Sequence, residues 1–446
     1  MILRPSASLL FASCLVLTAL SGCDDAATSQ RLAVTHGNAM AAASPARGDE
    51  PEPPDEPDEP DDPDTPGDPP DDPWNPPDEP VTPPDEPDEP PDEPDEPPDE
   101  PDEPPDEPDE PPDEPDEPPD EPDELDGVLV ESLPFVDTWD TTLGESVMDA
   151  YACAPGTNES GPEIVYRVTT PTAGLLTATL SGLPSDVDVD VHILDGDAPA
   201  SCVDRGHWDA AAFLGPGDHT VVVDSWVDSS GVAYPGEYTV TIGFTPADGF
   251  ADAGLDPDVF ETALQVFGAA WKAGDTARME YTVIDFSLHS MYPRLFTFDL
   301  KVGALLFAER VCHGEGSAVA GDPAWAERFS NITGSHQSSL GLMRTASRYQ
   351  SQSNGLSLRL DGLEDGINDL VRPRAIVMHS DSYATPAFVE TYGRMGTSWG
   401  CQVIDPARID AFVDTVEGGS LVWSWYPDPD FVYASGYLID VDVAGL

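Results

Sequence analysis

The sequence predicts a mainly β protein in which an antiparallel β-sandwich precedes a mixed, mostly β domain with peripheral helices. From residue 127 onward, short runs rich in Val, Ile, Thr and Tyr alternate with Gly- and Pro-containing turns. Only two helical patterns interrupt these runs. Before them, residues 49–126 hold about forty of the 87 acidic residues, no Lys or Arg, and a proline at about every third position. Such a segment is expected to be a long disordered linker.

The first residues indicate export. Arg4 precedes an apolar run at residues 9–20, which is too short to span a membrane but typical of a secretory signal. The run ends in Leu-Ser-Gly-Cys23, which resembles the bacterial lipobox, whose cysteine is acylated and becomes the mature N-terminus. This resemblance implies a signal peptide at residues 1–22, lipidation of Cys23 and a tether at residues 23–48. The protein would then be lipid-anchored in the cell envelope, on the periplasmic face or cell surface of a bacterium.

The linker at residues 49–126 repeats Asp-Glu-Pro and Pro-Asp-Glu-Pro units. Proline removes amide donors and fixes φ while neighbouring carboxylates repel one another, so an extended, solvated chain is expected. Its role stays open between a spacer of selected length and a solubilising segment. The formal net charge of −69 argues against nucleic acid as a partner.

Residues 127–247 are predicted to form the sandwich. In Asp186–Val191 strict alternation would place valines on one face of a strand and carboxylates on the other. We expect these carboxylates to face solvent rather than to bind calcium. The strands are expected at residues 164–168, 175–180, 187–194, 219–224 and 238–244.

This segment resembles the bacterial pre-peptidase C-terminal domain in "VDVDVHILDGD", "LGPGDHTVVVDS" and "PGEYTVTIGF". The resemblance implies a non-catalytic module. Cys153 and Cys202 both fall inside it, so they are expected to form a disulfide, which an exported protein permits.

Residues 248–446 are predicted to form the second domain. A helix is expected to begin with Asp256 as N-cap and Pro257 in its first turn, followed by apolar residues at helical spacing. A second, amphipathic helix is expected at residues 406–416. Strands are expected at residues 281–288, 295–302, 305–311, 356–360, 375–378 and 420–426.

Cys401 lies in the glycine-flanked stretch "GTSWGCQV", where a cysteine serves either a disulfide or nucleophilic chemistry. Gly400 permits a tight turn whose amide groups could point at one spot, as an oxyanion hole requires. Upstream, His379 follows the apolar run at residues 375–378 and is the candidate base for a thiol. This spacing alone is weak evidence.

The chain from about Phe260 to its end resembles the murein L,D-transpeptidase catalytic domain. The matching stretches are "IDFSLHS", "RLFTFDL", "HGEGS", "FSNITGSHQSSLG", "GLSLRLDGLEDGIND", "RAIVMHSDSY" and "GTSWGC". The resemblance implies that Cys401 is the nucleophile and His379 the general base, that the amides of Gly400 and Cys401 stabilise the oxyanion, and that Ser398 supports the turn.

Four further residues are pocket candidates. His336 and His313 match motif positions, and Arg374 and Arg394 could meet substrate carboxylates, although each also has an ordinary structural interpretation. The sequence departs from the family pattern in two places. Gln402 and Val403 follow the cysteine where a proline-containing continuation is usual, and Cys312 precedes His313 in place of a small apolar residue. Cys312 is expected to be a buried thiol, with a Cys312–Cys401 disulfide as the alternative.

The expected reaction is acyl transfer on peptidoglycan tetrapeptide stems through a thioester, with release of D-alanine and an amine as acceptor. No metal or organic cofactor is expected. The alternatives are an L,D-carboxypeptidase that uses water, a non-catalytic peptidoglycan-binding or surface lipoprotein, and a metallopeptidase with ligands from Cys312, His313, His336 and His379. No His-x-His or His-Glu-x-x-His spacing supports the last.

Overall fold

The computed structural model describes residues 127–439 and residue 441. The expected signal peptide at residues 1–22, the lipidation site Cys23, the tether at residues 23–48 and the linker at residues 49–126 lie outside the described residues. Within the described part of the chain, no helix has the length and apolar composition needed to cross a membrane.

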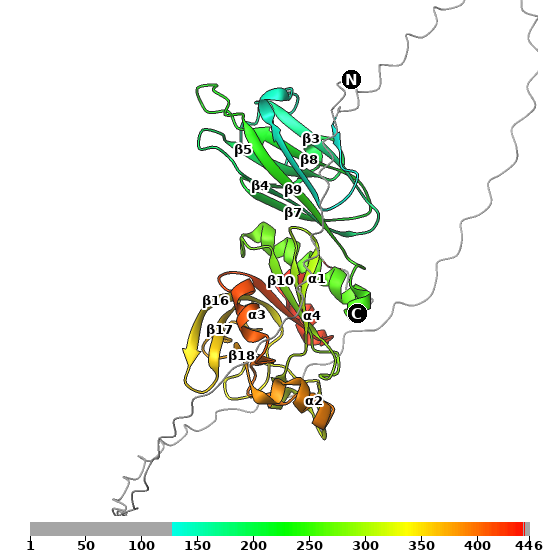
Figure 1. Ribbon diagram of the computed structural model, residues 1–446, viewed down its shortest axis with the longest axis vertical. Helices are drawn as coiled ribbons and strands as arrows, with labels where there is room; N and C mark the ends of the chain where they lie inside the picture. The colour runs from blue at the N-terminus through cyan, green and yellow to red at the C-terminus, as the bar shows by residue number, and fades with distance from the viewer. Residues whose placement is uncertain (1–126, 440, 442–446) are drawn as a thin grey trace, which may run out of the picture. The chain divides into compact units, whose positions relative to one another are not determined.

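The residues from Val128 to Pro246 form two sheets, which confirms the predicted sandwich (Figure 1). The strands of one sheet follow the order β1-β3-β8-β5-β6, and those of the other the order β2-β9-β4-β7. All neighbours are antiparallel except β1 and β3. Apolar residues from both sheets form one core. The strands are β1 Val128–Leu129, β2 Phe135–Asp140, β3 Glu163–Thr170, β4 Gly174–Ser181, β5 Val189–Leu194, β6 Cys202–Gly206, β7 Asp209–Leu214, β8 Gly217–Ser225 and β9 Glu237–Pro246.

The expectation of a solvated carboxylate face on β5 is wrong for Asp190. All six residues of β5 are buried, and Asp190 is only 1% exposed. Its carboxylate pairs with the guanidinium of Arg205 on β6 and lies 3.2 Å from Nδ1 of His207. Because these cationic or proton-donating groups compensate the charge, the strand is buried on both faces. Asp188, just before β5, stays partly exposed.

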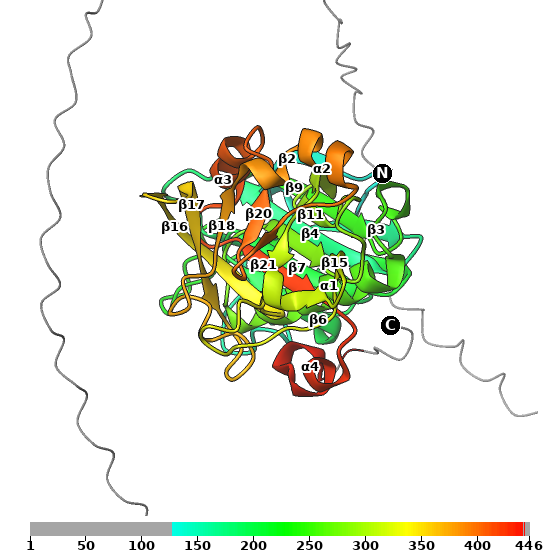
Figure 2. The same cartoon turned by 90° about the horizontal axis from the view of Figure 1, so that it is seen from below.

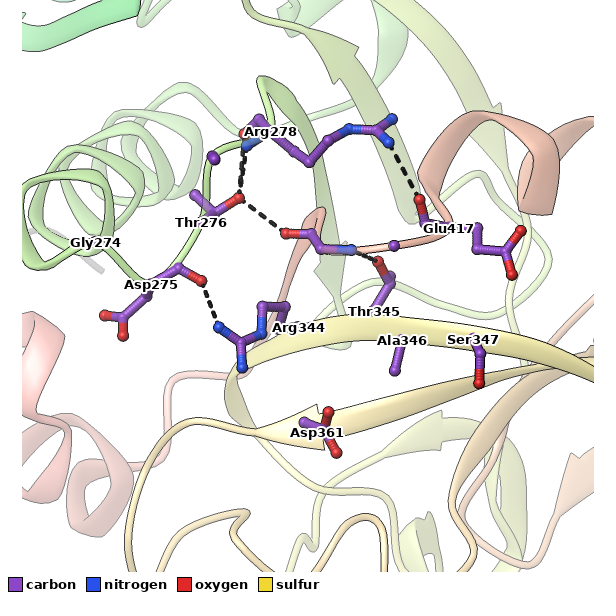
Figure 3. A pocket seen from close by; sticks show the side chains of 13 residues that line it. Gly274, Asp275, Thr276, Arg278, Arg344, Thr345, Ala346, Ser347, Asp361 and Glu417 are labelled. Atoms are coloured by element: carbon purple, nitrogen blue, oxygen red, sulfur yellow. Dashed lines mark hydrogen bonds between the residues drawn. The ribbon is translucent and has the colours of Figure 1, made fainter. Parts of the chain in front are cut away.

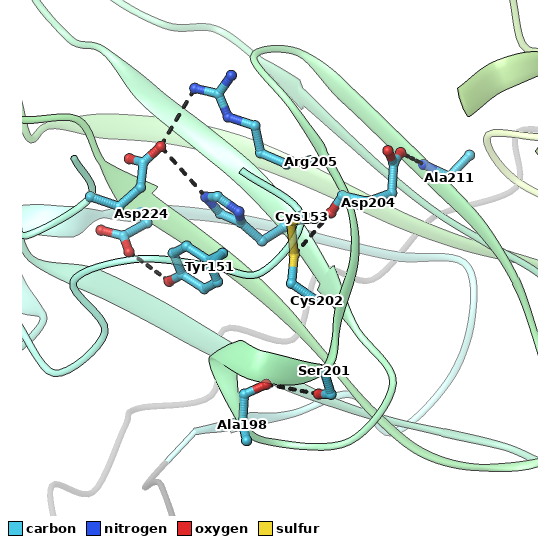
Figure 4. Close-up of a disulfide and its surroundings, with 11 residues drawn as sticks. Tyr151, Cys153, Ala198, Ser201, Cys202, Asp204, Arg205, Ala211 and Asp224 are labelled. Atoms are coloured by element: carbon cyan, nitrogen blue, oxygen red, sulfur yellow. Dashed lines mark hydrogen bonds and ion pairs between the residues drawn. A yellow bond between two sulfur atoms is a disulfide. The ribbon is translucent and has the colours of Figure 1, made fainter. Parts of the chain in front are cut away.

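A disulfide joins Cys153 to Cys202, the two cysteines expected to pair, and holds the segment before β3 against the outer face of β5 (Figure 4). Tyr151 in this segment stacks on His192 of β5, with ring centroids 3.8 Å apart. The Tyr151 hydroxyl also donates to the carboxyl group of Asp224 over 2.6 Å. Burial raises the pKa of Asp224 to about 9 and lowers that of His192 to about 3. The segment therefore covers a polar cluster on the outer face of this sheet.

An eight-stranded sheet with the order β12-β11-β10-β21-β16-β17-β18-β20 forms the core of the second domain. The pairs β10–β21 and β18–β20 are parallel and the others antiparallel, so the predicted mixed, mostly β domain is confirmed. Figure 2 shows β16, β17, β18 and β20 in this order. The strands are β10 Glu280–Asp285, β11 Leu295–Asp299, β12 Ala304–Glu309, β16 Gly341–Ser351, β17 Gly355–Gly362, β18 Val377–Ser380, β20 Gln402–Ile404 and β21 Leu421–Trp425. Two small ladders pair β13 His313–Gly314 with β19 Thr397–Ser398, and β14 Ala318–Val319 with β15 Asp322–Ala326.

Helix α1, Pro257–Ala273, begins where its capping residues predict. The Asp256 side chain accepts a hydrogen bond from the amide of Asp258, and Pro257 fills the first turn. At the other end Gly274 adopts a φ of 77° and donates its amide to the last carbonyls. The buried face of α1 contributes Phe260, which packs against Phe298 of the sheet. The other helices are α2 Pro386–Tyr392, α3 Ile409–Val416 and α4 Pro429–Ala434.

Candidate active site

Strands β18 and β20 bring His379 and Cys401 to one face of the large sheet. In the parallel register Met378 lies opposite Gln402, and His379 lies opposite Val403. Since side chains alternate between faces, Cys401, just before β20, shares the face of Val403 and His379. Strand spacing and rise place the Cα atoms of Cys401 and His379 about 8 Å apart on the diagonal. The two side chains can therefore meet above the sheet.

Cys401 carries a free thiol that is partly exposed. The thiol donates a hydrogen bond to the carbonyl of Ala375, with Sγ 3.7 Å from the oxygen. Burial raises the pKa of the Cys401 thiol, while the backbone N–H of Val377 and the guanidinium of Arg374 oppose that rise. The resting cysteine is thus a neutral thiol that needs a base to become a nucleophile.

His379 is suited to be that base. It is buried, and its Nδ1 lies 3.1 Å from the carbonyl of Ser380. Because a carbonyl only accepts, Nδ1 carries the proton and Nε2 keeps its lone pair. Burial lowers the pKa of His379, with the Ser380 carbonyl and Asp381 opposing the change, so the imidazole is neutral at pH 7. A neutral imidazole with a fixed tautomer can accept the thiol proton.

The turn before Cys401 is held by the hydroxyl of Ser398. Ser398 Oγ donates to the carbonyl of Cys401 over 2.7 Å and accepts the amide of Gly400 over 3.2 Å. Gly400 has a φ of 112°, and a Cβ there would lie 2.7 Å from the carbonyl oxygen of Gln337. The Gly400 amide is therefore engaged within the turn in this structure, and its role toward an oxyanion stays a prediction.

Ser338, which the sequence analysis did not single out, fixes the same turn from outside. This buried residue donates its hydroxyl to the carbonyl of Gly400 over 3.1 Å and accepts the amide of Gly314 over 3.0 Å. Gly314 also pairs with Ser398 in the β13–β19 ladder. The hydroxyl thus links three segments that are distant in sequence, and no local motif signals such a role.

Of the pocket candidates, His336 lies beside the turn that precedes Cys401. Its ring stacks on Trp399 with centroids 4.7 Å apart, and its Nδ1 lies 2.8 Å from a carboxylate oxygen of Glu315. Trp399 is 72% exposed. The two rings form an aromatic wall next to Cys401. An aromatic residue one step before the Gly-Cys pair is the signal from which Trp399 could have been found.

The side chains of the other three candidates form hydrogen bonds within the protein. His313 is buried, its Nδ1 accepts from Arg294 over 2.7 Å, and its pKa is lowered to about 2 by burial and two arginines. Arg394 donates to the carbonyl of Met395. Arg374 donates to the residues of the neighbouring loop that supply hydroxyl or carbonyl oxygens: Ser330, Ser335, Gln337 and Ser339. Neither arginine forms an ion pair with an acidic residue in the described range.

The two positions that depart from the family pattern are both buried. Cys312 is a free thiol whose pKa burial raises to about 12, so it is inert at neutral pH. Gln402 lies on β20 between Cys401 and Val403, and its side chain therefore faces the opposite side of the sheet from the nucleophile. Its amide oxygen and nitrogen have no hydrogen-bond partner among the described residues.

The histidines proposed as metal ligands do not converge. Among residues 127–439, the clusters with ligand spacing are Cys153, His192 and Cys202, whose sulfurs form the disulfide, and Asp188, Asp190 and His207 in the sandwich. Neither cluster includes Cys312, His313, His336 or His379. The geometry gives the metallopeptidase alternative no support.

A cavity of about 710 Å³ lies away from this site, between the end of α1 and strand β16 (Figure 3). Figure 3 shows Arg344 donating to the backbone of Asp275, and Arg278 donating to that of Glu417, over 2.9 Å and 3.2 Å. Neither Cys401 nor His379 lines it. Chemistry rather than size therefore locates the candidate active site.

Part of the chain matches a known protein family. Residues 251–425 match the model of the L,D-transpeptidase catalytic domain. The matched range contains Cys401, His379 and all eight strands of the large sheet. The match supports a peptidoglycan-modifying function of the L,D-transpeptidase type. None of the curated proteins matches the chain.

Solved structures resemble the protein only distantly. An L,D-transpeptidase from Mycobacterium smegmatis is 11% identical, with a TM-score of 0.22, over 59% of this chain and 97% of that chain. The periplasmic inhibitor of g-type lysozyme PliG from Aeromonas hydrophila is 12% identical, with a TM-score of 0.18, over 26% and 95% of the two chains. At such TM-scores neither likeness bears on the fold or function of this chain.

Proposed function

We propose that the protein is a cell-envelope lipoprotein whose C-terminal domain is a cysteine L,D-transpeptidase. The observation that carries the proposal is the placement of Cys401 and His379 on one face of two adjacent parallel strands. The free, partly exposed thiol and the neutral imidazole are the pair that acyl transfer through a thioester requires. The family match over residues 251–425 supports the same reaction type.

In the first half-reaction, Nε2 of His379 takes the proton of the Cys401 thiol as sulfur attacks the carbonyl at the L-centre of diaminopimelate in a tetrapeptide stem. The tetrahedral intermediate then expels D-alanine, whose amine receives the proton from the imidazolium. A thioester on Cys401 remains. In the second half-reaction an amine attacks the thioester, His379 removes the amine proton, and sulfur leaves as the thiolate that is reprotonated. Water in place of the amine would give the L,D-carboxypeptidase reaction.

The remaining segments would carry this domain to its substrate. A lipid on Cys23 would hold the protein at the membrane, and the acidic segment at residues 49–126 would act as a spacer. Residues 127–247, with the pre-peptidase C-terminal resemblance, would be a non-catalytic module. Peptidoglycan stem peptides are the proposed partner, and the proposed location is the periplasmic face or the cell surface.

The test is D-alanine release from tetrapeptide muropeptides by the full chain, followed by mass spectrometry. Cys401→Ala should abolish release and remove the thioester adduct. Cys312→Ala is the matched control, because this thiol is buried and inert, and it should keep the activity. Release that persists in Cys401→Ala would overturn the proposal. A tripeptide product without cross-links or amine adducts would identify the carboxypeptidase reaction.

A further inference from the structure

A small cavity of about 180 Å³ lies near Cys401, although Cys401 does not itself line it. Ala375, whose carbonyl accepts the Cys401 thiol, is one of its lining residues, and Val377 is another. Two arginines, Arg359 and Arg372, lie in its wall together with Tyr349. Two cationic side chains in the wall of one small cavity are unusual in a chain that has 18 basic residues against 87 acidic ones.

The sheet register places Arg359 in line with the nucleophile. Arg359 on β17 is paired with Val377 on β18, and Val377 takes the position opposite Cys401 one step before the β18–β20 pairing begins. The three residues thus form one row across three strands, with their side chains on the same face. Two strand spacings separate the backbones of Arg359 and Cys401 by about 10 Å.

The guanidinium of Arg359 is held in place but lacks an anionic partner. Its Nη1 donates to Oγ and the carbonyl of Ser347 on β16, over 3.1 Å and 3.4 Å, and its Cζ lies 4.0 Å from the centre of the Tyr349 ring. Among the described residues no carboxylate forms an ion pair with it, whereas Arg372 pairs with Asp361. The remaining N–H donors of Arg359 are free to bind a planar anion.

From this placement we infer that Arg359 forms a subsite for a carboxylate of the donor peptide, a role that rests on the proposed function. Ser347 and Tyr349 hold the guanidinium on the side of β17 that faces away from Cys401. The bound carboxylate therefore lies about 10 Å or more from the scissile carbonyl. The terminal carboxylate of the leaving D-alanine is one residue from that carbonyl, about 3.5 Å, and falls short. The ligand is an internal carboxylate of the stem, on the acyl side of the scissile bond.

The subsite replaces the interpretation in which Arg374 and Arg394 meet substrate carboxylates. Both terminal nitrogens of Arg374 donate to oxygens of the neighbouring loop, and Arg394 donates to a backbone carbonyl. Arg359 is the arginine that combines position on the active face, contact with the cavity and free donors.

The test measures binding without turnover. Calorimetry on the full chain carrying Cys401→Ala gives the Kd of a tetrapeptide stem and of two analogues. In one analogue a carboxamide replaces the internal carboxylate of the second residue. In the other a carboxamide replaces the terminal carboxylate. Adding Arg359→Gln removes a charge-assisted contact, so it should raise the Kd of the unmodified stem about ten-fold. The Kd of the analogue with the terminal amide should rise by the same factor. The analogue with the internal carboxamide should bind with the same Kd whether or not Arg359→Gln is present. Arg359→Lys should recover part of the affinity.

Arg348→Gln is the matched control, because this arginine of the same hairpin pairs with Asp414 and Glu417 at the surface. It should leave all three Kd values unchanged. If Arg359→Gln weakens all three ligands equally, or none of them, the subsite is overturned even when the wild-type chain releases D-alanine. Arg359→Gln could weaken binding only of ligands that keep the internal carboxylate while the wild-type chain releases no D-alanine. In that case the subsite stands and the proposed function falls.

Discussion

The thiol of Cys401 donates to the carbonyl of Ala375, with Sγ 3.7 Å from the oxygen, and not to the imidazole of His379. Ala375 adopts a φ of 55°, a left-handed conformation that is unfavourable for a residue with a Cβ. Such strain is often kept at functional sites. The resting state therefore holds the thiol proton on a backbone carbonyl, and in the proposed reaction the thiol must rotate toward Nε2 of His379.

Because the thiol is neutral at rest, turnover should depend strongly on His379. His379→Gln should lower kcat for D-alanine release by about 10² to 10⁴, the usual contribution of a general base. Alkylation of Cys401 by iodoacetamide above pH 9, where hydroxide supplies the base, should continue in the variant. Mass spectrometry of the alkylated chain serves as the check that the cysteine is still in place. Wild-type kcat in His379→Gln would remove this residue from the mechanism.

Gln402 predicts a stability effect rather than an activity effect. Its buried amide has two polar atoms without partners among the described residues, and it faces away from Cys401. An unsatisfied buried polar group costs about 1–3 kcal/mol, so Gln402→Met, which keeps the length, should raise the free energy of unfolding by up to that amount. Denaturant unfolding measures it. A lower stability would mean that the amide has a partner, such as an ordered water.

Reduction of the Cys153–Cys202 disulfide should destabilise the sandwich. The bridge closes a loop of 49 residues, for which the chain-entropy estimate is about 3–4 kcal/mol. The double variant Cys153→Ala and Cys202→Ala should therefore unfold at a lower temperature in calorimetry, as should the wild type in a reductant. Adding reductant to the double variant is the control and should change nothing. An unchanged Tm in both cases would contradict a stabilising bridge.

Asp224 predicts a stability that falls as pH rises. Burial raises its pKa to about 9 in the folded protein, far above the ordinary value near 4, so the folded state binds more protons than the unfolded state between these limits. Its contribution is complete below about pH 4 and is lost as pH rises toward 9. Asp224→Asn cannot lose a proton there. The stability of the variant relative to wild type should rise with pH, by at most about 1.4 kcal/mol per pH unit.

Denaturant unfolding of both chains at pH 5, 7 and 9 measures this difference. The lowered pKa of His192 has the opposite effect on stability below pH 6.5. Because both chains contain His192, its contribution cancels in the difference between them. A difference that does not change with pH would show that Asp224 ionises normally in the folded protein.

Local chemistry determined much of the fold. The start of α1 follows from Asp256 and Pro257, because a cap acts within one turn of the chain. The β-branched runs gave the approximate positions of β3, β4, β5, β8 and β9. Strand β7, Asp209–Leu214, was not predicted, because three of its six residues are alanine, which has low strand propensity. Only pairing with β4 makes this segment a strand.

The sequence by itself determined the chemical type of the candidate site, since Cys401 and His379 stand in stretches that resemble one family. Tertiary structure alone decided that Asp190 is buried beside Arg205, that Arg374 donates hydrogen bonds to a neighbouring loop, and that Arg359 lies in one row with Cys401. The physical reason is the sequence distance over which each effect acts. Capping and strand propensity act over a few residues, whereas burial and sheet register depend on segments that meet only after folding.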